Sequence, residues 1–82
     1  MGVCQKEVIK LSDDLRNLRE DLKGELTAVN DYQDHIDLAE DDEVREVLAH
    51  IRDEEKEHVA ELVRLLRKLD EVQEAKFREE EG

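Results

Sequence analysis

The fold class is decided by residues 47–66, which read VLAHIRDEEKEHVAELVRLL. Apolar residues recur in this stretch at alternating steps of three and four. Such a heptad pattern is typical of an α-helix that presents one apolar seam. Two adjacent seam positions are polar, and they are occupied by Glu55 and His58. The seam positions of the stretch are Leu48, Ile51, Glu55, His58, Leu62 and Leu65.

The same seam continues on both sides of this stretch and has a counterpart earlier in the chain. We expect one helix over about 42–76, with its seam running from Val44 to Val72, and a frayed tail from about residue 76. An earlier helix is expected over about 5–39, with a start at Ser12 as the alternative, and its single polar interruption is Glu25. The seam positions of that helix are Val8, Leu11, Leu15, Leu18, Leu22, Glu25, Val29, Tyr32, Ile36 and Ala39.

A short acidic connection joins the two expected helices. Asp41 or Asp42 suits the N-cap of the later helix, because a short carboxylate side chain can accept from the free backbone N–H groups there. A connection this short folds two helices into an antiparallel hairpin. We therefore predict an all-α, single-domain chain over 1–82 that folds as an antiparallel two-helix hairpin.

Composition narrows the function classes. The chain has 82 residues, 25 acidic and 13 basic, with a formal net charge of −12, no Pro, no Trp and a single Cys. One cysteine excludes an internal disulfide scaffold, and no apolar run is long enough to cross a membrane. The strong negative charge argues against binding to nucleic acid. We expect a cytoplasmic helical protein. Domains this small are usually stabilised by a metal or by partner chains.

The three polar seam positions converge on one level of the hairpin. Glu25 precedes the connection by about as many residues as Glu55 and His58 follow it. At about 1.5 Å of rise per residue, all three lie roughly 20–25 Å from the turn. We call these three residues the polar layer.

The chemistry of the polar layer favours a metal. Buried carboxylates are costly unless they are paired or bind a cation. Four-helix carboxylate sites for paired iron or manganese take one Glu from each of two helices and Glu-x-x-His from each of the other two. This chain carries half of that set, so two copies would complete it. Their four carboxylates would balance two divalent cations. The alternative is a layer that only sets helix register.

Two stretches are similar to the encapsulated ferritins: GELTAVNDY at 24–32 and VLAHIRDEEKEH at 47–58. The resemblance implies two-helix subunits that complete a ferritin-like four-helix bundle by homodimerisation around a di-iron ferroxidase centre and assemble as a ring of dimers inside an encapsulin shell. It implies that Glu25, Glu55 and His58 are iron ligands and that Tyr32 lies beside the centre. Some members carry acidic residues beside the first ligand, where this chain has Gly24 and Thr27.

Other residues have weaker assignments. His50, Glu54 and Glu57 could bind a second, exposed metal ion, although a solvated charged face explains the same spacing. Tyr32 could supply an electron or a proton to the centre, or it could simply pack in the seam. Three apolar residues that widen the stripe of the later helix are assigned to a contact between dimers. They are Val59, Val63 and Leu66.

The expected function follows from the polar layer together with the resemblance. We expect a ferroxidase that oxidises Fe(II) to Fe(III) with dioxygen at a di-iron site shared between two chains, feeding iron storage as an encapsulin cargo. The alternative is a non-enzymatic helical oligomerisation module with a structural metal or a register-setting layer. A rubrerythrin-like peroxidase is disfavoured because the chain has no Cys-x-x-Cys electron-transfer site.

Overall fold

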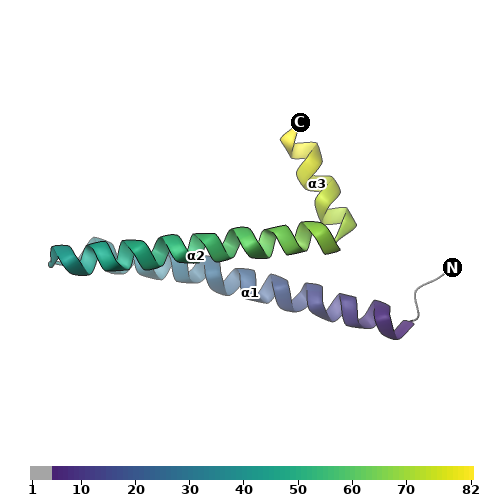
Figure 1. Cartoon of the computed structure of the whole chain (residues 1–82), viewed down its shortest axis with the longest axis horizontal. Helices are drawn as coiled ribbons and strands as arrows, with labels where there is room; N and C mark the ends of the chain where they lie inside the picture. Colours follow the sequence, from purple (N-terminus) through teal and green to yellow (C-terminus); the bar gives the residue numbers. More distant parts are fainter. Residues whose placement is uncertain (1–4) are drawn as a thin grey trace.

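The chain forms two long helices and a short third one. The computed structural model describes residues 5–82 and the side chains from residue 10 onward. The helices are α1 (Gln5–Leu38), α2 (Asp42–Leu69) and α3 (Glu71–Glu81). Figure 1 shows α1 and α2 side by side as a hairpin, with α3 turned away from the end of α2. Within residues 5–82, no helix is long and apolar enough to span a membrane.

The hairpin turn is capped as the sequence predicts. Asp41 is the N-cap of α2, and its side chain accepts a hydrogen bond of 3.0 Å from the backbone N–H of Val44. Arg45 donates to the carbonyl oxygen of Ala39 and to the carboxylate of Asp42, which ties the end of α1 to the start of α2. These contacts reverse the chain within three residues, so that the two seams face each other.

One chain builds very little core. The molecule measures 61 × 32 × 14 Å, so it is about one helix thick in its shortest dimension. Leu66 is the one buried hydrophobic residue among the described side chains, with 6% of its surface exposed. Most apolar seam residues are only half-buried. The assignment of Leu66 to a contact between dimers is therefore wrong, because the single chain already covers it.

The later helix ends earlier than its apolar pattern predicts. The seam favours a helix to about residue 76, but α2 stops at Leu69 and Asp70 adopts an extended conformation, with φ −111° and ψ 99°. The Asp70 side chain then accepts from the backbone N–H of Gln73 at 3.0 Å and caps α3. The expected frayed tail is also wrong, since α3 is helical through Glu81.

The break at Asp70 has a physical cause that the seam pattern hides. Aspartate is a poor residue inside a helix and a good N-cap, because its carboxylate competes for backbone N–H groups. Only one further apolar seam residue, Val72, lies beyond the break, and in the structure it is 69% exposed. A single apolar side chain did not outweigh the cap.

Candidate metal centre

The structure brings the three residues of the polar layer together. Glu25 comes from α1, and Glu55 and His58 lie one turn apart on α2. The Nδ1 atom of His58 lies 3.6 Å from a carboxylate oxygen of Glu25 and 3.4 Å from one of Glu55. One donor atom from each residue falls within 4.8 Å of the other two, so the group could hold a metal ion. It is the one group of three such side chains within residues 10–82.

The polar layer lies open on one side. Exposed side-chain fractions are 27% for Glu25, 20% for Glu55 and 47% for His58. Part of each side chain, most of all that of His58, is therefore accessible to solvent in the single chain.

The charges of the polar layer are not balanced within the chain. Among the ion pairs of the described side chains, the contacts of Glu25 and Glu55 are to His58 and not to any Lys or Arg. The layer therefore sets two carboxylates against one imidazole, with no arginine or lysine to balance them. Two carboxylates and an imidazole, without a thiolate, suit iron, manganese or zinc.

Tyr32 lies two helical turns from Glu25, toward the hairpin turn. Its ring meets the His35 ring edge to face, with 6.4 Å between centroids. The two side chains line a shallow hollow together with Ala28 and Asp31. Seven residues of helix separate Tyr32 from Glu25, or about 10 Å along the axis. A role for Tyr32 in electron or proton transfer stays a prediction.

The expected second site is formed only in part. His50 and Glu54 are in contact, with Nε2 of the imidazole 2.7 Å from a carboxylate oxygen. Both are largely exposed, and Glu57 does not join them in a three-ligand group within residues 10–82. This arrangement matches an ordinary surface pair one turn apart on a helix, and metal binding there stays a prediction.

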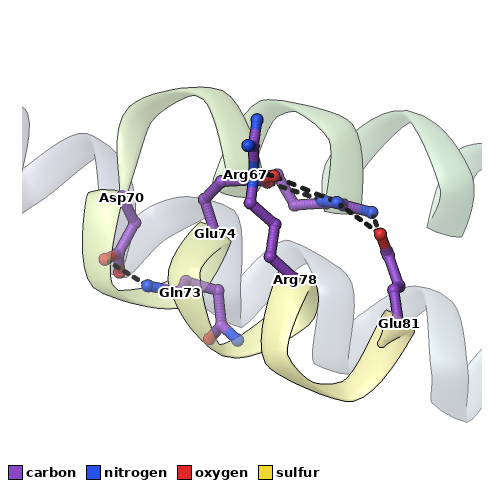
Figure 2. A network of polar contacts seen from close by, with 6 residues as sticks. All are labelled: Arg67, Asp70, Gln73, Glu74, Arg78 and Glu81. Carbon is purple, nitrogen blue, oxygen red and sulfur yellow. Dashed lines mark hydrogen bonds and ion pairs between the residues drawn. The ribbon is translucent and has the colours of Figure 1, made fainter.

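A second polar cluster was not predicted from the sequence. Figure 2 shows Arg67 of α2 reaching two carboxylates of α3. Its guanidinium donates to both oxygens of Glu74, at 2.6 and 3.0 Å, and to Glu81 at 2.7 Å. Glu74 also accepts from Arg78 at 2.9 Å. We call these four residues the Arg67 clamp.

The clamp shifts the ionisation of its members. The hydrogen bonds from Arg67, and then from Arg78, lower the pKa of Glu74 to about 2. The hydrogen bonds to Glu74 and Glu81 raise the pKa of Arg67 further above its ordinary range. The Arg67 guanidinium also stacks over the Phe77 ring, 4.7 Å from its centroid. An aspartate followed three residues later by a glutamine, here Asp70 and Gln73, is the sequence signal that could have revealed α3.

Comparison with known proteins gives a consistent set of relatives. The chain is 38% identical over 64 residues to the encapsulin nanocompartment cargo protein EncC of Myxococcus xanthus, covering 78% of this chain and 49% of that protein. It is 40% identical over 65 residues to the cargo protein EncB of the same organism, covering 79% of this chain and 41% of EncB. An encapsulated ferritin-like protein of Rhodospirillum rubrum is 48% identical over 46 residues, covering 56% of this chain and 33% of that protein.

The chain spans half or less of the length of these curated relatives. The model of the EncFtn-like family, by contrast, matches residues 4–80, which is nearly the whole chain. That match includes both helices of the hairpin and all three residues of the polar layer. This chain belongs to the EncFtn-like family.

Proposed function

We propose that this protein is a ferroxidase that oxidises Fe(II) to Fe(III) with dioxygen at a paired-iron site built by two copies of the chain. The observation that carries the proposal is the polar layer: two carboxylates and an imidazole from two helices, open on one side and without a basic partner. Family membership supports the same function.

The donor set fits half of a paired-iron site. Each chain supplies one Glu from α1 and Glu-x-x-His from α2, and a carboxylate-bridged pair of metals in a four-helix bundle uses twice that number. Two copies would provide four carboxylates and two imidazoles. The four negative charges would be balanced by two divalent cations, so the layer would be neutral only when both sites are filled.

The thin core of the hairpin supports a second copy as the missing half. The half-buried seam residues of α1 and α2 form one apolar face, and the polar layer lies within it. Packing two such faces together would bury the seam and bring the two polar layers into contact. A domain of this size, with one buried hydrophobic residue among residues 10–82, would gain most of its stability from such an association.

The residues have separate tasks in this proposal. Fe(II) is the substrate, and each ion gives one electron to dioxygen. Glu25 and Glu55 supply hard oxygen donors, which favour the ferric product over the ferrous substrate. His58 holds the metal through a neutral nitrogen and adds no charge. The negative exterior of the chain would raise the local concentration of Fe(II).

The relatives named as cargo proteins suggest where the iron goes. EncB and EncC are named as encapsulin nanocompartment cargo proteins. We infer that this chain is likewise enclosed in an encapsulin shell, where ferric iron produced at the site would be stored.

The test is the initial rate of Fe(II) oxidation in air, followed by ferric absorbance and corrected for iron alone. His58→Ala and Glu55→Ala should each abolish the catalysed rate, because each change removes two ligands per dimer. His50→Ala removes an exposed histidine of the same helix outside the layer and should keep most of the activity. If Glu55→Ala oxidises iron as fast as the parent protein, the layer only sets register and the proposal is wrong.

A further inference from the structure

The end of α2 holds two conflicting signals. The apolar seam reaches Leu69 and then Val72, which favours one continuous helix. The structure instead bends the chain at Asp70 and leaves Val72 69% exposed. Val72 is the most exposed apolar seam residue among the described side chains, so an arrangement that buries it would be favourable.

The first turns of α1 offer a surface for that second arrangement. Glu25 faces Glu55 and His58 across the hairpin, so Leu69 is level with about residues 11–14 of α1. Figure 1 shows α1 running on past the end of α2. Leu11, close to the level at which α2 ends, is 41% exposed. A continuous α2 would place Val72 beside these turns.

Charged contacts join α3 to α2 in the bent arrangement. No residue of α3 is buried, and α3 contacts α2 rather than α1. The Arg67 clamp joins the two helices with four guanidinium contacts, and Phe77 lies under the Arg67 guanidinium. From α1, Arg19 reaches the carboxylate of Asp70 at 3.6 Å.

We propose that Asp70 is a hinge with two settings: a bent one, in which the Arg67 clamp holds α3 on the outer side of α2, and a straight one, in which α3 continues α2 alongside the first turns of α1. Straightening requires mainly a change of ψ at one residue, from 99° to the helical range near −40°. It gives up the clamp and the cap on Gln73. It gains the burial of Val72 and Leu11 and restores unbroken backbone hydrogen bonding through the hinge.

The consequence is a switchable length of the apolar face. In the bent setting the hairpin face ends at Leu69. In the straight setting it extends by one seam position, to Val72, which gives a partner more apolar surface to pack on. Weakening the clamp, by salt or by neutralising its carboxylates, would shift the chain toward the straight setting.

A distance measurement between two spin labels tests the hinge. Labels are placed on Glu46→Cys of α2 and Glu80→Cys of α3, in a Cys4→Ser background, and the labelled chain is diluted with unlabelled protein so that only distances within one chain are read. If α3 continues α2, the labelled backbone positions lie roughly 50 Å apart, at 1.5 Å per residue. If Glu81 keeps its contact with Arg67, the labelled backbone positions lie roughly 30 Å apart.

The parent protein should give the short distance, and Glu74→Gln/Glu81→Gln should move the main population to the long one with helix content unchanged in circular dichroism. Glu71→Gln/Glu79→Gln removes the same charge without touching Arg67 and should keep the short distance. Adding Val72→Asn to Glu74→Gln/Glu81→Gln should reduce the population at the long distance, because the straight setting then no longer buries an apolar side chain at residue 72. The proposal is overturned if the parent already gives the long distance, if the released variant keeps the short one, or if its α3 melts.

Discussion

The polar layer and the Arg67 clamp contain the same number of carboxylates but differ in what balances them. The clamp sets two arginines against two glutamates, so its net charge is zero, and the pKa of Glu74 falls to about 2 because arginine donors stabilise its charged form. The polar layer has one imidazole beside its two carboxylates and, among the described side chains, no arginine or lysine to balance them. A cluster balanced by its own arginines needs no ligand, whereas a cluster with excess negative charge at half-buried positions has a place for a cation.

The sharpest test of this comparison removes one carboxylate from each cluster with the same isosteric change. Glu25→Gln should lower the affinity for Zn(II) or Fe(II) by at least roughly 100-fold, because even residues that only support a ligand contribute 10–100-fold. Glu74→Gln should leave metal affinity unchanged. Calorimetric titration of both variants measures the difference. Equal losses in the two variants would mean that overall charge, and not the polar layer, attracts the metal.

The next effect is on stability and assembly. A metal that binds only the assembled state stabilises it by about 2.7 kcal/mol at a free concentration of 100 times Kd. Fe(II) or Zn(II) should therefore raise the melting temperature and shift the chain toward dimers or larger oligomers in sedimentation. Glu74→Gln should retain this response and Glu25→Gln should lose it. Chelated and metal-loaded parent protein that melt and sediment alike would contradict a shared metal site.

Acid should act on the clamp in a defined window. The ordinary pKa of Glu74 is 4.5 and its pKa in the folded chain is about 2. Because the folded value is the lower one, the contribution of Glu74 to stability is fully present above pH 4.5 and is lost as the pH falls toward 2. Arg67 and Arg78 keep their charge throughout, so α3 should leave α2 within this window.

The pH experiment follows the same Glu46–Glu80 label distance during acid titration. Other carboxylates also protonate in this range, so the control is the difference between the parent and Glu74→Gln, which should shrink as the pH falls from 4.5 to 2. Release of α3 complete by pH 4.5 would show that the carboxylate of Glu74 is not stabilised by the clamp.

The hairpin and the polar layer could be predicted because periodicity carries them. Steps of three and four fix which residues share a seam, and an equal number of residues on each side of the turn fixes their level. Glu25, Glu55 and His58 therefore come together in the structure as the sequence predicts. The N-cap at Asp41 could also be predicted, because capping depends on residues that are close together in the sequence.

The bend at Asp70 and the clamp could not be predicted from periodicity. The seam steps continue through Val72, so the pattern alone extends α2 past its real end. Whether a helix breaks there depends on the balance between one cap, one exposed valine and an arginine whose partners are seven and fourteen residues away. Only the folded arrangement of α3 brings those carboxylates within reach of Arg67.

The smallest expected effect comes from an ion pair that resembles the clamp in chemistry only. Lys76 and Glu79 lie 3.4 Å apart on α3, one turn apart and with about two thirds of each side chain exposed. Pairs of this kind stabilise a helix by about 0.2–0.5 kcal/mol, and salt screens most of that. Glu79→Gln should therefore leave the Glu46–Glu80 label distance unchanged and lower the melting temperature barely or not at all.

Because Glu79→Gln and Glu74→Gln remove the same charge from the same helix, a similar release of α3 in both would trace the effect to the charge of α3 as a whole. A release of α3 in Glu74→Gln alone would trace the effect to the bidentate contact with Arg67. That contact joins two helices, whereas the Lys76–Glu79 pair lies within one.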